Sequence, residues 1–216
     1  MYAADDRRLG PGHTDPVEPL SLRRVGADAV LVEVADSAQA RSLAAYARAV
    51  RTPALEVVPG ARTVLFDGVP DLDGLASLLG RWSPDDEPEP GPLVEVPVAY
   101  DGADLAFVAE RWETDVAGVV ARHGAIEFVS AFGGFAPGFA YLAGLAEEYA
   151  VPRLERPRAR VPAGSVALAG SWCGVYPTAS PGGWRLLGRT DAPLWDPDRS
   201  PPALLAPGTR VRFVAG

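Results

Sequence analysis

A short segment rich in proline and acidic residues limits the possible folds of this chain more than any other feature. Residues 83–92 read SPDDEPEPGP and contain no aliphatic or aromatic side chain that a core could bury. We therefore expect an exposed linker between two folded parts. The predicted organisation of the 216 residues is a polar, frayed leader, a small domain, the linker and a larger domain, at 1–18, 19–82, 83–92 and 93–216.

The first predicted domain combines strands with two helices. Apolar and alternating runs predict strands at 19–26, 29–35, 55–58 and 63–66. Helical spacing of apolar residues follows Ser37, which we expect to cap the first helix, and a second short helix is predicted at 72–82. The order β-β-α-β-β-α predicts a small α+β sandwich with both helices on one face of the sheet.

The second predicted domain is mainly β. It begins with a strand at 93–100, interrupted by Pro97, and two helices at 104–112 and 114–122. Short apolar runs separated by Gly and Pro turns then predict strands at 126–132, 165–169, 184–187 and 210–214. This spacing favours an all-β barrel or sandwich.

Charge and composition exclude several classes of function. The net charge of −8 offers no attraction to nucleic acid or to anionic lipid. The leader lacks a hydrophobic signal region, and no run reaches the roughly 18–20 apolar residues that cross a bilayer. The single cysteine agrees with a reducing compartment, so we expect a cytoplasmic protein without a membrane partner.

All 20 basic residues are arginine, which limits the cofactors that this chain can carry. Without lysine, the chain cannot form a Schiff base with PLP, carry biotin or provide a Walker A lysine. One cysteine and two histidines without HxxxH or CxxC spacing also argue against a structural zinc or another metal site. Arginine remains suited to a small anionic substrate.

The densest motif is GGFAPGFAYL at residues 133–142. Its glycines permit a close backbone approach to a ligand, and Phe135, Pro137, Gly138 and Tyr141 could wall a pocket. A barrel corner that buries these aromatics in the core is the alternative.

Residues 180–184, SPGGW, pose the same choice. Gly182 and Gly183 allow a close approach beside Ser180, and Trp184 could stack on a ligand or simply pack. Upstream, Arg153 and Arg158 lie in PRLERPRAR, where closely spaced arginines could clamp an anion or remain solvated.

His123 is the credible general acid or base of the chain, because the other histidine, His13, lies in the leader. It ends a predicted helix, where it could instead cap the terminal carbonyls. Cys173 has no activating neighbour in sequence, which favours a small buried residue over a nucleophile.

Taken in order, His123, GGFAPGFAYLAGL, VPRLERPRARVPAGSVALAG, GVYPTASPGGWRLLGRT and LLAPGTRVRF resemble the KipI/PxpB family, also called the 5-oxoprolinase B subunit or allophanate hydrolase subunit 1. The resemblance is strong over residues 93–216 and weaker over 19–82. It implies a cyclophilin-like β-barrel after the small α+β domain.

The resemblance also implies partners and a reaction. Members pair with a KipA/PxpC-like C subunit and, together with a PxpA-like A subunit, couple hydrolysis of ATP, as co-substrate of the complex, to opening 5-oxoproline into glutamate. In this interpretation the residues of the two glycine motifs wall the pocket, Arg153 and Arg158 hold a carboxylate or phosphate, and His123 transfers a proton. The alternatives are a KipI-type inhibitor of a sensor histidine kinase and a component of urea or allophanate metabolism.

Overall fold

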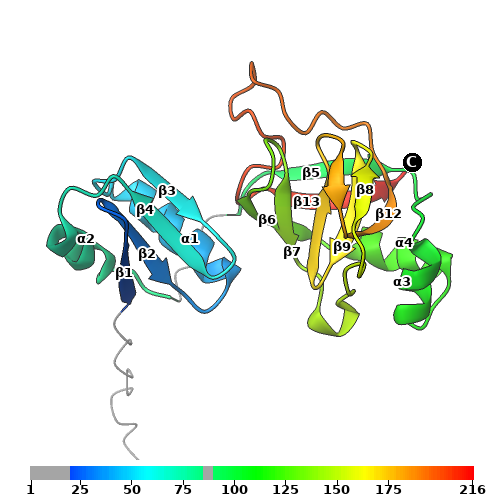
Figure 1. The fold of residues 1–216 in the computed structure, drawn as a ribbon, viewed down its shortest axis with the longest axis horizontal. Coiled ribbons are helices and arrows are strands. Elements are labelled where there is room, and N and C mark those ends of the chain that lie inside the picture. Colours follow the sequence, from blue (N-terminus) through cyan, green and yellow to red (C-terminus); the bar gives the residue numbers. More distant parts are fainter. Residues whose placement is uncertain (1–19, 85–89) are drawn as a thin grey trace, which may run out of the picture.

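The structure, a computed structural model, describes residues 20–84 and 90–216. The predicted leader and the centre of the predicted linker lie outside these residues. Within them the chain has a mixed α/β fold with four α-helices, a four-stranded sheet and a nearly closed barrel (Figure 1).

The four-stranded N-terminal sheet is antiparallel throughout, in the order β1-β2-β4-β3. Its elements are β1 (Ser21–Val25), β2 (Ala29–Glu33), α1 (Ser37–Ala49), β3 (Glu56–Pro59), β4 (Thr63–Asp67) and α2 (Leu72–Leu79). Alternate residues of β2 and β4, among them Val32 and Phe66, point to one face and pack with Leu43 of α1 and Leu75 of α2. This part of the chain therefore has its own apolar core.

The N-cap of α1 is Asp36, which corrects the prediction of Ser37. The Asp36 carboxylate accepts a hydrogen bond of 2.9 Å from the Gln39 backbone N–H, while the Gln39 side chain accepts one of 3.0 Å from the backbone N–H of Ala35. A carboxylate at this position also complements the positive end of the helix dipole, so the capping residue lies one position earlier than the hydroxyl.

The barrel contains seven strands in the order β12-β9-β10-β7-β6-β13-β5. Their bounds are β5 (Leu93–Val98), β6 (Phe128–Gly133), β7 (Ala140–Ala143), β9 (Ser165–Ala169), β10 (Trp172–Val175), β12 (Arg185–Arg189) and β13 (Arg210–Ala215). Ala99, just beyond β5, pairs with Arg189 of β12 through two hydrogen bonds of 2.9 Å. This bridge joins the two ends of the sheet and nearly closes the barrel.

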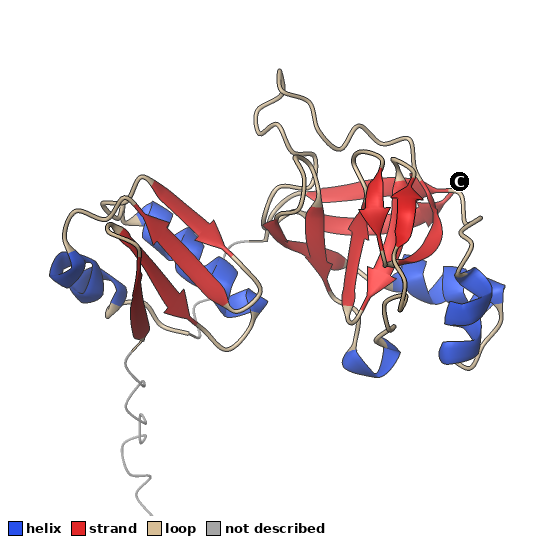
Figure 2. Ribbon diagram, in the orientation of Figure 1, coloured by secondary structure: helices blue, strands red, loops and turns tan. Residues whose placement is uncertain are grey.

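Helices α3 (Leu105–Arg111) and α4 (Val116–Ala125) lie on the flank of the barrel, near its C-terminal end (Figure 2). A 3-10 turn, η1 (Glu147–Tyr149), follows β7. Outside the barrel, β8 (Arg158–Val161) and β11 (Ser180–Gly182) form a separate two-stranded sheet. This small sheet covers part of the outer face of the barrel and leaves room for a second apolar cluster.

Strand β9 shows how the barrel wall separates two apolar clusters. Its five residues, SVALA, are all buried. Val166 and Leu168 belong to the cluster inside the barrel, whereas Ala167 and Ala169 belong to the outer cluster beneath β8 and β11. Since successive side chains of a strand point to opposite faces, one wall supports two environments.

Pro97 does not interrupt β5, contrary to the prediction. The strand pairs in parallel with β13 through Val98, with Pro97 opposite Val214. Because β5 is the edge strand of the seven-stranded order, a missing N–H on its outer side removes no ladder hydrogen bond. The described residues contain no helix that is both long and apolar enough to cross a membrane.

Candidate functional site

An aromatic pocket of about 370 Å³ opens on the outer face of the barrel. Its walls come from the loop before β7, from β7 itself, from the β9–β10 turn and from the segment between β11 and β12. The aromatic residues that line it are Phe135, Phe139, Tyr141, Trp172, Tyr176 and Trp184. A pocket of this size, lined mostly by aromatic groups with few polar ones, is typical of a small-molecule site.

The rings of the aromatic pocket pack edge to face. Phe139 lies 5.5 Å from Trp184 at 86° and 5.6 Å from Tyr176 at 80°, and Tyr141 lies 5.7 Å from Trp184 at 66°. Edge-to-face pairs fix the orientation of each ring beyond what burial alone would do. The pocket walls are therefore held in place by one another.

Phe135 stands at the mouth of the aromatic pocket in an unusual conformation. Its φ is 67°, in the left-handed region that non-glycine residues rarely adopt, and its side chain is 60% exposed. Gly138 follows at φ +86°, where an added Cβ would lie 2.9 Å from the Cβ of Trp195. The glycine lets the loop turn tightly against residues 194–195 and so places Phe135 over the pocket.

Glycines also allow the rings of the pocket to approach the backbone. A Cβ at Gly182 would collide with the Tyr176 hydroxyl, and one at Gly174 would lie 3.0 Å from the Phe139 ring and 3.1 Å from the Trp184 ring. Any larger residue would force these rings to move, because contacts this short are outside the normal range for a real Cβ. The small residues are thus part of the pocket's shape.

Arg153 supplies the positive charge of the aromatic pocket. It is exposed at the rim, and no hydrogen bond or ion pair engages it within residues 20–84 and 90–216. Burial raises the pKa of the Tyr176 phenol, although a hydrogen bond from the Trp184 backbone and the charge of Arg153 act in the opposite direction. Tyr176 therefore stays protonated at neutral pH and can donate a hydrogen bond.

Arg158, the predicted ligand of a substrate carboxylate or phosphate, does not line the aromatic pocket. Its Nη2 donates a hydrogen bond of 2.9 Å to Oδ2 of Asp104, and its Nη1 donates one of 3.3 Å to the Trp184 carbonyl. Asp104 Oδ2 also accepts a 2.7 Å hydrogen bond from the Leu186 N–H. The guanidinium already pairs with the Asp104 carboxylate and the Trp184 carbonyl. Arg158 therefore holds Trp184 in position, and its charge is compensated within the chain.

His123, the predicted proton-transfer residue, does not line the aromatic pocket. It lies fully buried inside the barrel, with Nδ1 2.7 Å from the Tyr100 hydroxyl and Nε2 3.4 Å from Cys173 Sγ. Its ring stacks on Phe213, and burial lowers the pKa of His123 to about 3. An imidazole with so low a pKa and no exposure is a poor general base at neutral pH, and its nitrogens face Tyr100 and Cys173 rather than the terminal carbonyls of α4.

The remaining predicted site residues do not line the aromatic pocket. Pro137 is exposed in the loop, and the Gly183 carbonyl accepts a 2.7 Å hydrogen bond from the Leu154 N–H, which holds the segment next to Arg153. Ser180 Oγ is buried and has no hydrogen-bond partner among the described residues. Five of the predicted substrate-binding residues line this one pocket: Phe135, Tyr141, Arg153, Gly182 and Trp184.

Phe139, Trp172 and Tyr176 line the pocket although the predicted site does not include them. Each of the first two adjoins a residue considered in the sequence: Phe139 follows Gly138, and Trp172 precedes Cys173. For Trp172 the available signal was strand alternation, since the residue before a core-facing Cys173 must face outward. Tyr176 follows the same strand and had no distinguishing signal in sequence.

Comparisons with known proteins place the chain in a family. Residues 20–205 match the model of the carboxyltransferase domain, subdomain C and D. The 5-oxoprolinase B subunit of Escherichia coli O157:H7 is 44% identical over 168 residues, which cover 74% of this chain and 77% of that protein. The 5-oxoprolinase B subunit of Haemophilus influenzae is 37% identical over 185 residues, which cover 82% of this chain and 87% of that protein.

Solved structures agree with this relationship. TTHA0988 is 35% identical with a TM-score of 0.74 over 88% of this chain, which spans only 40% of the length of TTHA0988. The conserved uncharacterized protein PH0987 from Pyrococcus horikoshii is 32% identical with a TM-score of 0.54, over 91% of this chain and 97% of that one. The Kluyveromyces lactis urea amidolyase, at 19% identity and a TM-score of 0.67 over 91% of this chain and 15% of its own, shares the fold alone.

The family model and the identity to curated relatives lead to the same assignment: this chain belongs to the carboxyltransferase subdomain C and D family and, within it, to the 5-oxoprolinase B-subunit (PxpB/KipI) proteins.

Proposed function

We propose that this chain is the B subunit of an ATP-dependent 5-oxoprolinase, and that its aromatic pocket binds 5-oxoproline. Its curated relatives are named as B subunits of 5-oxoprolinase. The observation that carries the placement of the substrate is the uncommitted Arg153 at the rim of an aromatic pocket.

The chemistry of 5-oxoproline fits this pocket. The molecule has one carboxylate and a compact lactam ring, and a guanidinium binds a carboxylate through two parallel hydrogen bonds. In the proposed pose Arg153 holds the carboxylate and the ring packs against the pocket wall that Tyr141 and Trp184 form together. The protonated Tyr176 hydroxyl then donates a hydrogen bond to the lactam carbonyl, which the raised pKa of that phenol favours.

The pocket binds and orients the substrate in this proposal, but it does not open the ring alone. Its ionisable lining residues in the described chain are Tyr141, Arg153 and Tyr176, and His123 lies inside the barrel. No group of that set is a general base at neutral pH. We therefore assign the attack on the lactam and the use of ATP to the assembled complex, with a KipA/PxpC-like C subunit and a PxpA-like A subunit.

Reconstitution tests the proposal directly. The chain is mixed with its cognate KipA/PxpC-like and PxpA-like partners, and glutamate formed from 5-oxoproline is measured with and without ATP. We expect ATP-dependent turnover that needs all three proteins, and recovery of the untagged KipA/PxpC-like partner with the tagged chain. A complex that turns over equally well without this chain would sink the proposal.

Substitution of Arg153 tests the placement of the substrate. Arg153→Gln should raise KM for 5-oxoproline about tenfold or more, since a charged hydrogen bond contributes about 1.5–3 kcal/mol. Arg156→Gln is the matched control, because Arg156 is a similarly exposed arginine three positions away that does not line the pocket. Equal KM values for the two variants would exclude Arg153 as the carboxylate ligand while leaving the assignment to 5-oxoprolinase intact.

A further inference from the structure

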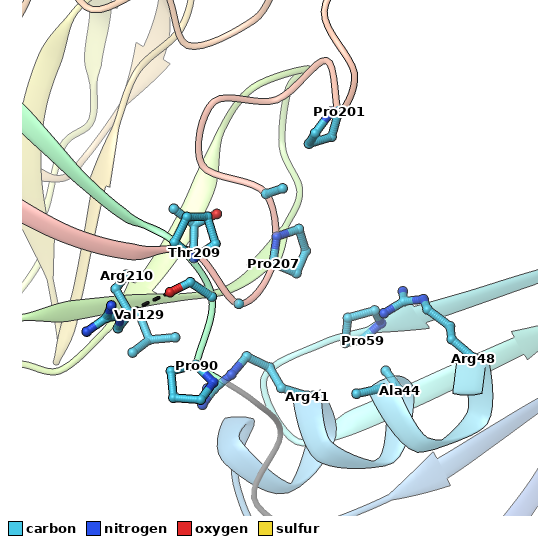
Figure 3. Close-up of a pocket in the computed structure, with 15 residues that line it drawn as sticks. Arg41, Ala44, Arg48, Pro59, Pro90, Val129, Pro201, Pro207, Thr209 and Arg210 are labelled. Atoms are coloured by element: carbon cyan, nitrogen blue, oxygen red, sulfur yellow. Dashed lines mark hydrogen bonds between the residues drawn. The ribbon is translucent and has the colours of Figure 1, made fainter. Parts of the chain in front are cut away.

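A second pocket, of about 520 Å³, lies where the N-terminal sheet meets the barrel. Figure 3 shows α1 and β3 on one side and the turn before β13 on the other. Its lining includes Arg41 and Arg48 of α1, Pro59 of β3, Pro90, and Arg210 of β13. Within the described residues, this junction pocket shares no lining residue with the aromatic pocket, so the two are separate sites.

The charge of the junction pocket is opposite to that of the whole chain. Among the residues that the structure describes, three arginines line it and no aspartate or glutamate does. The chain as a whole carries a net charge of −8. Concentrating cations around a concave, mostly apolar surface raises the local concentration of anions there.

Arg41 is the residue of the junction pocket whose charge is least compensated by the described chain. It is half-buried, and burial lowers the pKa of its guanidinium even though Asp36 acts electrostatically against that effect. Its contact is a 3.4 Å hydrogen bond from Nη1 to the Ser37 carbonyl, and no carboxylate of the described chain forms an ion pair with it. Burying a charge without a counter-charge is costly, so an anion from outside would stabilise this arrangement.

The other two arginines also keep free donors. An arginine has five N–H donors. Arg48 uses Nη2 for a 2.7 Å bond to the Val57 carbonyl, and Arg210 uses Nε for the Gly91 carbonyl at 3.0 Å and Nη1 for Glu127 at 3.3 Å. In Figure 3 Arg41 extends from α1 toward Pro90. Arg210 lies on the opposite side of the pocket, where the dashed line marks its hydrogen bond to the Gly91 carbonyl.

We propose that the junction pocket binds a small molecule with two or more linked phosphates. Three arginines on two elements suit several negative charges spread along a ligand better than a single carboxylate, and each planar fork matches two phosphate oxygens. The volume exceeds that of a lone phosphate and falls in the range of small-ligand sites. Since α1 packs on the N-terminal sheet and β13 belongs to the barrel, the ligand would tie these two parts together.

Calorimetric titration of the full-length chain with inorganic pyrophosphate tests this site. We expect binding with one site per chain, weakening steeply with salt. The double variant Arg41→Gln/Arg48→Gln should lose at least tenfold in affinity. The control Arg23→Gln/Arg24→Gln removes the same charge from exposed positions on β1 and should bind like the parent. Failure of the parent to bind, or equal losses in both double variants, would overturn the proposal.

Further arms identify the chemistry. Citrate should bind much more weakly than pyrophosphate, and equal affinity would overturn the assignment to phosphates. Tighter binding of a nucleoside diphosphate would support the assignment to linked phosphates and would show that the pocket also contacts a group attached to them. If the double variant unfolds, pyrophosphate affinity is measured on Arg48→Gln alone, because Arg48 lies at an exposed helix position. The aromatic-pocket variant Arg153→Gln should bind pyrophosphate normally, so this result is independent of 5-oxoprolinase activity.

The acidic segment at 85–89 provides the last control, because it precedes Pro90 in sequence and carries four carboxylates. In the variant Asp85→Asn/Asp86→Asn/Glu87→Gln, pyrophosphate should bind at least as tightly as in the parent. Binding that appears only after these carboxylates are neutralised would overturn the proposal, since the chain would then satisfy its own arginines.

Discussion

Trp172 and Cys173 are consecutive residues of β10 that lie on opposite faces of the barrel wall. Trp172 lines the aromatic pocket outside, whereas the Sγ atom of Cys173 lies 3.4 Å from Nε2 of His123 inside. Strand β10 therefore lies between the aromatic pocket and the buried imidazole. In the proposed reaction, proton transfer to a substrate in that pocket has to come from a group other than His123.

The buried position of His123 makes folding sensitive to acid. Burial lowers the pKa of His123 to about 3, against 6.5 in the unfolded chain. Between these values the unfolded state binds the extra proton, so this contribution to stability is complete above pH 6.5 and is lost as the pH falls toward 3. We expect a slope of up to about 1.4 kcal/mol per pH unit from this residue in urea unfolding.

Two measurements check the role of His123. The variant His123→Gln should lose this part of the slope. In a His13→Gln background, the one remaining imidazole should keep neutral nitrogen NMR shifts down to about pH 4.5. An imidazole that titrates near pH 6.5 in the folded protein would contradict the prediction.

Cys173 should be chemically silent while the protein is folded. Its side chain is fully buried, and burial raises the pKa of the thiol above its usual range. Since the thiolate is the reactive form, a disulfide reagent at pH 8 should leave the native chain unmodified and react rapidly in urea. Rapid modification of the native chain, with its melting temperature unchanged, would show that the barrel interior is accessible.

Asp104 should contribute more to stability than any exposed ion pair. Its carboxylate is 7% exposed and lies 2.9 Å from Arg158 and 3.5 Å from Arg185. Asp104→Asn leaves two cations without a counter-charge, so we expect a loss of about 2–4 kcal/mol in urea unfolding. The control Asp101→Asn removes the exposed partner of Arg189 and should change little. Equal losses would indicate that the Asp104 network does not hold β12 in place.

The Asp104 network also shows where sequence reasoning ends. PRLERPR indicates an anion-binding arginine, but the anion is a carboxylate 54 positions earlier in the same chain. The role of His123 was equally undecided, because Tyr100 and Cys173 are 23 and 50 positions away. Local patterns predict strands and turns, whereas such pairings depend on the topology that brings distant strands together.

Other features were predictable because their cause is local. The glycines and aromatics of residues 133–142 predict either a loop that walls a pocket or a barrel corner that buries its aromatics. In the structure Phe135 and Tyr141 line the aromatic pocket, while Phe139 belongs to the outer apolar cluster. The short strands β8 and β11 escaped prediction, since a three-residue strand containing Pro181 has no clear alternation. The cyclophilin-like description of the barrel stays a prediction beside its likeness to carboxyltransferase structures.

Gly182 should be intolerant of a side chain. A Cβ there would collide with the Tyr176 hydroxyl, whereas a Cβ at Gly133 would have its nearest neighbour at 3.7 Å. We expect Gly182→Ala to lose about 1–3 kcal/mol through overpacking and Gly133→Ala to stay within about 1 kcal/mol of the parent. Thermal and urea unfolding of both variants measures this. Equal free energies of unfolding for the two variants would mean that Tyr176 can move aside and that this wall of the aromatic pocket is not tightly packed.

Residues 19–82 and 93–216 should fold separately. The core of the N-terminal sheet draws on residues between Leu20 and Trp82, and both barrel clusters draw only on residues from Val94 onward. A protease that cleaves on the N-terminal side of aspartate should therefore cut first before Asp85 or Asp86, and mass spectrometry of the early products identifies the bond. The variant Asp85→Asn/Asp86→Asn should slow this first cut without changing the melting temperature. Expressed alone, residues 93–216 should unfold cooperatively in urea, because their clusters need no residue from the N-terminal sheet. A first cut within residues 133–183, or a fragment 93–216 without a cooperative transition, would show that the two parts form one folding unit.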